Sequence, residues 1–104
     1  MTNQCNSLDE VRQQIDLIDK EIIKLMSRRN QFVNRASQFK ESVDDIIAAE
    51  RVDSVISKVK TLSEESGLNP SVTEKVYRTM IRAFTEEELS AYNSQYRIIK
   101  ESYY

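Results

Sequence analysis

The residues of this sequence that could do chemistry are a few cations and one carboxyl group on apolar helical faces. Arg29 and Lys40 fall in a run whose apolar residues recur every three or four positions, and Arg12 lies near its edge. Glu88 falls in the middle of a second such run. Polar residues at core positions need a partner or a function. Their convergence in so small a chain predicts a cation-rich pocket for a small dianion.

A structural explanation of these charges is also available. The long side chains could reach solvent along the apolar faces, or Arg29 or Lys40 could form an internal ion pair with Glu88. For any one residue, this explanation would normally be preferred. We favour the pocket because several cations and one carboxyl group share the pattern.

Composition excludes several other chemistries and partners. The 104 residues contain no His and one Cys, which excludes Ser-His-Asp catalysis, an internal disulfide and a Cys-rich zinc site. In the run Glu86-Glu87-Glu88 only Glu88 faces inward, so we expect no metal. The net charge of −2 argues against nucleic acid. No segment is apolar enough for a membrane span or a signal peptide, which predicts a cytoplasmic protein.

The first helix is predicted to be unusually long. Ser7 and Glu10 fit a capping box, and helical spacing continues without Pro or Gly until Ser42. This predicts one helix of roughly 34 residues, about 50 Å in length. Residues 42–47 are a predicted linker, in which Asp44 or Asp45 would cap the next helix.

Two shorter helices are predicted after the linker. The second carries Val52, Val55, Ile56, Val59 and Leu62 on one face and ends near Gly67, a typical C′ residue. The third begins at Asn69-Pro70-Ser71, where Ser71-x-x-Glu74 is a second candidate capping box. It runs to about Arg97, and its predicted inward residues are Val72, Val76, Met80, Ile81, Phe84, Ala91 and Tyr92.

The predicted fold is therefore all-α, with three helices in one domain over residues 1–104 and possible tails at 1–7 and 98–104. The two shorter helices cannot cover the apolar stripe of the first, and an uncovered stripe of that size indicates an interface. The simplest assembly that would cover this stripe is a twofold homodimer that pairs the long helices.

The same helix geometry predicts how the cations share a site. Arg29 and Lys40 would lie three turns apart on one face, with backbones about 16 Å apart along the axis. Arg12 lies about 25 Å from Arg29, too far to reach the same ligand. Arg12 would contribute only from the other subunit, across an antiparallel partner helix.

These residues resemble the all-helical chorismate mutase family, which includes the isochorismate-pyruvate lyases. The resemblance extends from Leu8 to about Tyr92 and rests on Leu8-x3-Arg12-x2-Ile15-Asp16-x-Ile18-Asp19-x2-Ile22-x2-Leu25-x2-Arg28-Arg29, then Ala36-x3-Lys40 and Glu50-Arg51-Val52. It implies an intertwined homodimer with two equivalent sites, a cyclic dicarboxylate substrate and no cofactor.

The resemblance also implies a role for each residue. Arg29 would grip one substrate carboxylate, and Lys40 would bond the ether oxygen and a carboxylate. Arg12 would come from the partner subunit to the other carboxylate. Glu88 would hydrogen-bond the ether oxygen, and Glu50 would bind the substrate hydroxyl.

Two reactions fit this pattern. Chorismate mutase activity is our first expectation, since it matches the broad family and is compatible with Glu88. Isochorismate-pyruvate lyase activity, or both together, is the alternative, because the segment from Phe39 to Ile46 resembles the lyase branch. Glu88, however, replaces the Gln expected in that branch, and Ala49 replaces an Arg that many mutases carry. A non-catalytic helical dimerisation module is a more distant alternative.

Overall fold

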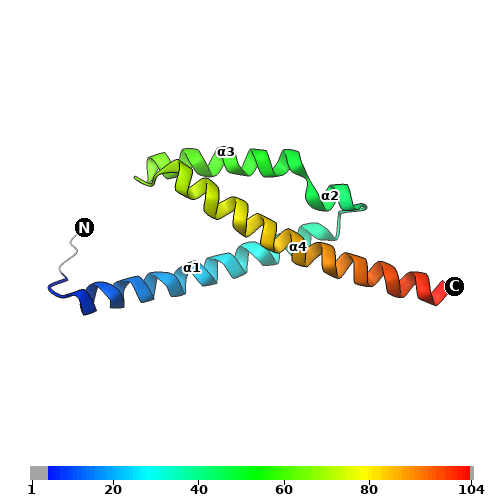
Figure 1. The fold of residues 1–104 in the computed structure, drawn as a ribbon, viewed down its shortest axis with the longest axis horizontal. Helices are drawn as coiled ribbons and strands as arrows, with labels where there is room; N and C mark the ends of the chain where they lie inside the picture. The colour runs from blue at the N-terminus through cyan, green and yellow to red at the C-terminus, as the bar shows by residue number, and fades with distance from the viewer. Residues whose placement is uncertain (1–4, 104) are drawn as a thin grey trace. The chain divides into compact units, whose positions relative to one another are not determined.

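The computed structural model describes the backbone of residues 5–103 and the side chains of residues 5–93. Over this range the chain is helical and contains no strand, which confirms the predicted all-α class (Figure 1). The helices are α1 (Leu8–Ser37), α2 (Val43–Ile47), α3 (Ala49–Glu65) and α4 (Pro70–Tyr103). None of the helices so described is long and apolar enough to cross a membrane.

The chain divides into two compact units, residues 1–36 and residues 37–104. That residues 1–104 form one domain stays a prediction. Of the two predicted tails, residues 1–4 and 104 lie outside the described residues. The three predicted helices are present, but α4 continues to Tyr103 where the prediction ended near Arg97.

α1 begins where the sequence predicted. The Glu10 N–H donates to Ser7 Oγ at 3.2 Å, and Glu10 Oε2 accepts from the Asn6 N–H at 2.6 Å. These two bonds satisfy backbone donors that have no partner inside the helix. The predicted cap at Ser7 is therefore confirmed.

α1 ends earlier than predicted, at Ser37 instead of just before Ser42. Ser42 is extended (φ −149°, ψ 166°), and its Oγ accepts from the Asp45 N–H at 3.1 Å. Asp45 Oδ2 in turn accepts from the Glu41 N–H at 3.0 Å. These bonds begin a new helix, α2, inside the predicted linker, and a residue that is extended cannot continue α1. Asp45 therefore stabilises the start of α2, and α3 follows Ala48 without a side-chain cap.

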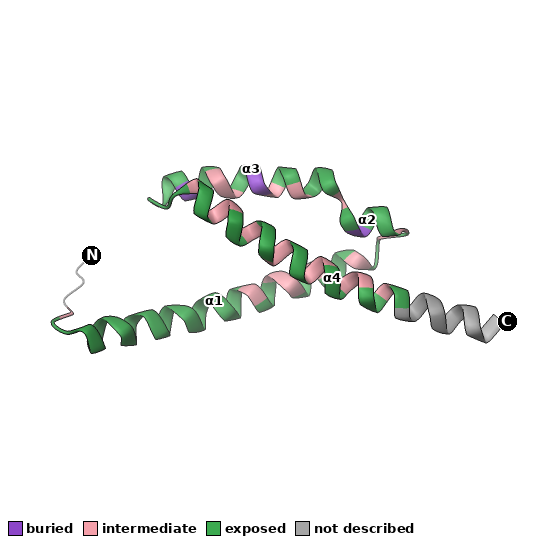
Figure 2. Ribbon diagram, in the orientation of Figure 1, coloured by how far each residue is buried: buried purple, intermediate pink, exposed green. Residues whose placement is uncertain are grey.

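Considered by itself, α1 has no buried residue (Figure 2). Its predicted apolar face is solvent-exposed in the single chain: the exposed fraction is 49% for Ile15, 58% for Leu25 and 66% for Phe32. A lone helix cannot bury such a face against itself. The stripe therefore has the exposure that the sequence analysis took as the sign of an interface.

In the second unit, α3 and α4 form a helical hairpin and α2 also packs against α4. α3 ends at a Schellman motif, in which the Leu68 N–H donates to the Ser63 carbonyl at 2.8 Å and the Gly67 N–H donates to the Glu64 carbonyl at 3.3 Å. Gly67 has φ of 77°, a left-handed conformation that costs glycine little. Its predicted C′ position is confirmed.

The start of α4 is capped by a different residue than predicted. Pro70 occupies the first helical position, as expected. The Ser71 N–H, however, donates to Asn69 Oδ1 at 2.9 Å, so Asn69 provides the cap. Ser71 and Glu74 do not form the predicted capping box, because the Glu74 carboxylate is bound to Lys60 and Arg78.

The core of this unit is small. Among the described side chains only Ile46, Ile56 and Ser63 are buried. The Ser63 hydroxyl group donates a hydrogen bond to the Val59 carbonyl at 2.8 Å. Val52, Val55 and Val59 on α3 are half-buried, as are Met80, Ile81, Phe84 and Tyr92 on α4. Leu62, Val72, Val76 and Ala91, which were predicted inward, are exposed. Within residues 37–104, α3 covers only part of the apolar surface of α4.

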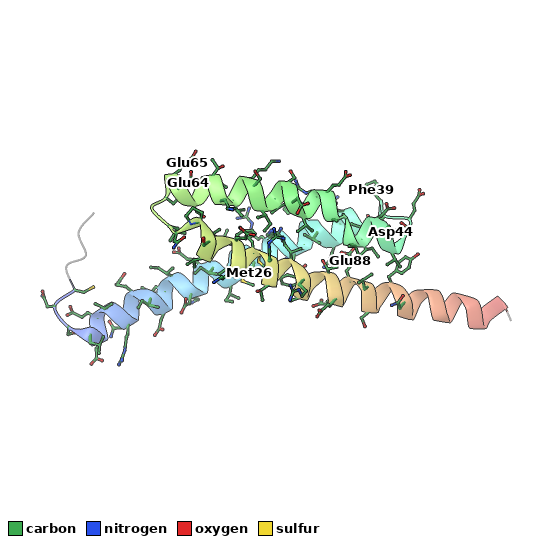
Figure 3. All side chains as sticks on the ribbon, turned by 45° about the horizontal axis from the view of Figure 1, so that its top comes forward. Met26, Phe39, Asp44, Glu64, Glu65 and Glu88 are labelled. Atoms are coloured by element: carbon green, nitrogen blue, oxygen red, sulfur yellow. The ribbon has the colours of Figure 1, made fainter. Side chains whose placement is uncertain are left out.

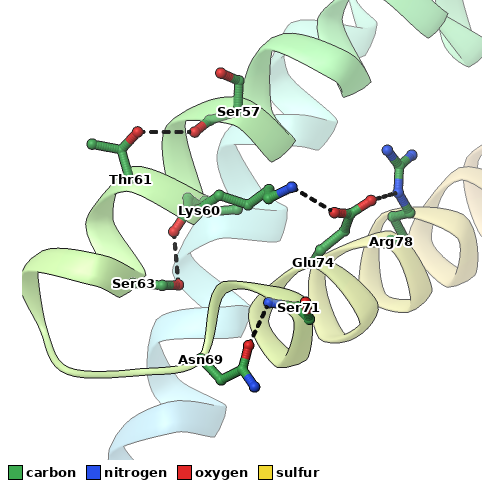
Figure 4. Close-up of polar contacts among 9 residues, drawn as sticks. Ser57, Lys60, Thr61, Ser63, Asn69, Ser71, Glu74 and Arg78 are labelled. Atoms are coloured by element: carbon green, nitrogen blue, oxygen red, sulfur yellow. Dashed lines mark hydrogen bonds and ion pairs between the residues drawn. The ribbon is translucent and has the colours of Figure 1, made fainter.

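A charged cluster joins α3 to α4 near their turn (Figure 4). Glu74 Oε1 accepts from Lys60 Nζ on α3 at 3.1 Å, and Glu74 Oε2 accepts from Arg78 Nε at 2.8 Å. The hydrogen bond from Arg78, followed by that from Lys60, lowers the pKa of Glu74. Glu74 thus contributes to stability as a carboxylate.

This lowered pKa predicts how stability depends on pH. Stability from a carboxyl group with a depressed pKa is fully present above the unfolded pKa, and it is lost as pH falls through the folded pKa. Wild-type stability should therefore fall as pH is lowered below about 5, and Glu74→Gln should show a smaller fall. Denaturant titrations at fixed protein concentration measure this, with Glu65→Gln as the exposed control. Equal pH dependence in the two variants would contradict the assignment.

Candidate active site

The structure brings two predicted site residues of the second unit into direct contact. Lys40 Nζ donates to both carboxylate oxygens of Glu88, at 3.1 Å to Oε1 and 2.9 Å to Oε2. The two residues are 48 positions apart in the sequence, and their side chains are 21% and 9% exposed. Figure 3 labels Glu88 on α4. This is the internal ion pair that the sequence offered as an alternative to a pocket.

Lys40 was predicted to lie on the first helix. In the structure it lies in the loop between α1 and α2. Its N–H donates to the Ser37 carbonyl at 3.1 Å, which tightens the last turn of α1. α2 follows directly and packs against α4 through a segment whose buried residue is Ile46, 5% exposed. The loop is therefore held close to α4 from its C-terminal side, and this allows Lys40 to reach Glu88.

Glu88 lies on the face of α4 that the sequence predicted. Tyr77, Met80, Phe84 and Glu88 recur at three- or four-residue spacing, and all four are half-buried. Glu88 therefore places a carboxyl group on a face of α4 that is otherwise largely apolar. The neighbouring Glu86 and Glu87 are exposed, as expected for carboxylates that point away from that face.

Glu50 is in the first turn of α3, two residues after Ala48, whose φ of 42° places it in the left-handed region. A non-glycine residue there is strained, and this strain accompanies the change of direction between α2 and α3. The Glu50 side chain is exposed and takes no part in the Lys40–Glu88 ion pair. Its predicted role stays a prediction.

The two predicted arginines belong to α1 and thus to the first unit. Arg29 is half-buried and has an interaction partner, whereas the Arg12 side chain is exposed. Both lie on the one helix α1, which the predicted separation of about 25 Å requires. The predicted three-turn spacing of Arg29 and Lys40 on one helical face is wrong, because α1 ends at Ser37 and Lys40 follows it in a loop.

The short helix α2, which positions the loop that carries Lys40, was not predicted from the sequence. Ser42 and Asp45 begin α2, and Ile46 anchors it, although residues 42–47 were predicted to be a linker in which Asp44 or Asp45 would cap the helix that follows. A signal was present, since Ser-x-x-Asp followed by two apolar residues is a helix start. It was obscured by the length of α2, which is only five residues.

The Lys40–Glu88 pair can supply two kinds of chemistry. An ammonium group stabilises negative charge that develops on a nearby oxygen atom, and the effect is larger where water is partly excluded. A carboxyl group donates a hydrogen bond when it is protonated and repels an anion when it is not. Among the described residues, no group of His, Cys, Asp or Glu is arranged to hold a metal ion.

Comparison with known proteins shows the family to which the chain belongs. A model of the family described as chorismate mutase type II matches residues 11–89, a segment that contains all five predicted site residues. The chain is also 33% identical over 85 residues to the isochorismate pyruvate lyase of Pseudomonas aeruginosa, an alignment that covers 82% of this chain and 84% of that protein. The match spans the long first helix, the loop with Lys40 and the helix with Glu88, and the chain therefore belongs to the chorismate mutase type II family.

Proposed function

We propose that this protein is a chorismate mutase that converts chorismate to prephenate, with Lys40 and Glu88 at the ether bond that breaks. One observation carries the proposal: the two residues meet in a partly buried ion pair, although 48 positions separate them. A family match that includes both residues supports it. The reaction needs no covalent intermediate, which agrees with a sequence that has no His.

The rearrangement breaks the ether C–O bond as a new C–C bond forms, and negative charge develops on the ether oxygen. Lys40 would donate a hydrogen bond to that oxygen and to a substrate carboxylate. Glu88 would donate a second hydrogen bond, for which it must be protonated. The remaining contribution is to hold a flexible dianion in its compact, reactive conformer, which removes much of the entropic barrier.

The carboxylates of the dianion would be bound by arginines from two subunits. Arg29 would bind one carboxylate, Arg12 of a second subunit the other, and Glu50 the hydroxyl group. This requires a homodimer. The exposed apolar face of α1 supports it, because uncovered stripes of this size normally mark an interface.

Isochorismate-pyruvate lyase activity is the second candidate. The similarity to a protein named isochorismate pyruvate lyase, which covers most of both chains, favours it. The same site residues would bind isochorismate, since it is also a dianion with an enolpyruvyl ether. Pyruvate elimination would need a different placement of the pyruvyl group against the ring, and salicylate would be the second product.

The first prediction concerns substrate and turnover. Purified protein should convert chorismate to prephenate, and the same assay with isochorismate should be resolved for salicylate and pyruvate. Lys40→Gln should keep its helical content and lower kcat by about 100-fold or more, because the cation at the ether oxygen is lost. Chromatography of the products and circular dichroism measure these outcomes.

Lys58→Gln, which removes an exposed lysine of α3, is the matched control and should retain full turnover. Salicylate as the dominant product would replace the mutase assignment with the lyase. No turnover of either substrate, together with a Lys40→Gln chain that unfolds, would favour a non-catalytic module in which the ion pair is structural.

The second prediction follows from the chemistry of Glu88. A carboxylate at this position would repel the charge that develops on the ether oxygen, whereas an amide would donate a hydrogen bond to it. Glu88→Gln should therefore retain mutase turnover, and Glu88→Ala, which has no donor, should lower it. Turnover assays of both variants measure this, together with the ratio of prephenate to salicylate. Equal turnover in Glu88→Gln and Glu88→Ala would contradict a hydrogen bond from position 88.

The third prediction tests shared sites. Arg12→Ala and Arg29→Ala should each be inactive alone, since every site then lacks one arginine. In an equal mixture, random exchange should restore about one quarter of wild-type activity, because half of the dimers would contain one intact site. Subunit exchange followed by a turnover assay measures this. Absence of any recovery, with exchange confirmed by mass spectrometry, would contradict Arg12 as a residue lent by the second subunit.

A further inference from the structure

A short segment of the second unit connects Lys40 to α2, and three hydrogen bonds hold its backbone. The Lys40 N–H donates to the Ser37 carbonyl at 3.1 Å, and the Glu41 N–H donates to Asp45 Oδ2 at 3.0 Å. Ser42 Oγ accepts from the Asp45 N–H at 3.1 Å. The backbone N–H groups on both sides of the Lys40 Cα atom therefore have specific partners.

The Asp45 side chain is the part of this arrangement that spans the loop. It accepts from a residue four positions earlier, which directly follows Lys40. The next residue, Ile46, is buried in a helix that packs against α4. One side chain thus connects the loop that carries Lys40 to the part of α2 that is anchored on α4.

Contacts with α4 close this segment into a ring. At one end Lys40 Nζ donates to Glu88 on α4, and at the other end α2 packs against α4 with Ile46 buried. The hydrogen bond from Glu41 to Asp45 links the two ends. In the single chain Lys40 is therefore held twice, by Glu88 through its side chain and by Asp45 through the neighbouring peptide group.

These two constraints differ when a substrate is bound. In the proposed function, the ether oxygen and a carboxylate of the substrate would take over hydrogen bonds that Lys40 Nζ gives to Glu88. The hydrogen bonds of the loop involve no atom that would bind the substrate. Asp45 would therefore still constrain Lys40 while the ether bond breaks.

We propose that Asp45 is a positioning residue, which holds the loop through the Glu41 N–H and so directs the Lys40 ammonium group to the reacting ether oxygen. The inference rests on the proposed function and adds a residue to which that function assigns no role. The Asp45 side chain is exposed and acts only through the backbone next to Lys40.

Loss of this constraint should affect the chemical step more than substrate binding. Charge on the ether oxygen develops in the transition state, so a misplaced Lys40 weakens an interaction that the bound substrate does not yet make in full. The substrate carboxylates would still be bound by the arginines of the proposed site. We therefore expect kcat to fall and KM to change little.

Substitutions in the first turn of α2 test this role in the full chain. Asp45→Ala should lower kcat about tenfold and change KM less than about twofold, because the loop loses its acceptor. Asp44→Ala removes the same charge from the same turn, but the Asp44 side chain takes no part in these hydrogen bonds, so kcat should be unchanged. Asp45→Asn retains an oxygen acceptor without the charge and should keep most of the wild-type kcat. Steady-state turnover assays measure these values, and circular dichroism checks helical content.

A double substitution shows whether Asp45 acts through Lys40. Adding Asp45→Ala to Lys40→Gln should lower the residual kcat no further, since the group that Asp45 positions is already absent. A residue that only stabilised the fold would lower kcat by the same factor in both backgrounds. Equal factors would therefore overturn the proposal.

Amide hydrogen exchange tests the contact without turnover. The Glu41 amide should exchange about tenfold faster in Asp45→Ala than in wild type, and at the wild-type rate in Asp44→Ala. An unchanged rate in Asp45→Ala would reject the contact. Should Asp45→Ala lose its helical content, Ser42→Ala, which releases the Asp45 N–H, should also lower kcat and speed Glu41 exchange, and wild-type values in that variant would overturn the proposal.

The outcomes separate this inference from the proposed function. If wild type turns over neither chorismate nor isochorismate, the proposed function and the positioning role both fall. If wild type is active and Asp45→Ala matches Asp44→Ala in kcat, only the positioning role is overturned. An equal fall of kcat in Asp45→Ala and Asp45→Asn would show that charge acts in place of the hydrogen bond, and would also overturn it.

Discussion

The hydrogen bonds that begin α2 at Ser42 decide where Lys40 can reach. Ser42 Oγ holds the Asp45 N–H, and Asp45 holds the Glu41 N–H, so the chain leaves the helical path that α1 would otherwise continue. α2 then packs on α4 with Ile46 buried. This packing keeps the loop that carries Lys40 near α4, where Lys40 donates to Glu88.

The Lys40–Glu88 ion pair contributes to the fold, and in the proposed function it would also contribute to the chemistry. As a partly buried ion pair, it offsets the cost of removing each charge from water, and loss of one partner leaves the other uncompensated. In the proposed reaction, the substrate would replace part of this contact and use the Lys40 charge at its ether oxygen. The carboxyl group at position 88 thus forms an ion pair of the fold and, in the reaction that we propose, would also affect the charge of the site.

The apolar surface that one chain leaves exposed is as informative as its contacts. Among the described side chains, two apolar residues are buried, and the stripe of α1 is open along its whole length. The described core of residues 37–104 is small, and burial of this extent contributes little stability. In the dimer we propose, the surface that completes the core would also bring Arg12 to the site, so that stability and activity would share one interface.

The sequence by itself determined the elements that depend on neighbours along the chain. The cap at Ser7, the C′ glycine at position 67, Pro70 in the first turn of α4 and the half-buried face that carries Glu88 all follow from local spacing and backbone preference. The early end of α1 and the cap at Asn69 also rest on hydrogen bonds within four residues, but local spacing offered competing helix starts and did not decide between them. Tertiary structure decided the contacts between distant segments, because they depend on which partner each polar group meets in the fold. Lys40 meets Glu88, 48 positions away, and Lys60 of α3 binds Glu74, a carboxylate that local spacing assigned to a capping box.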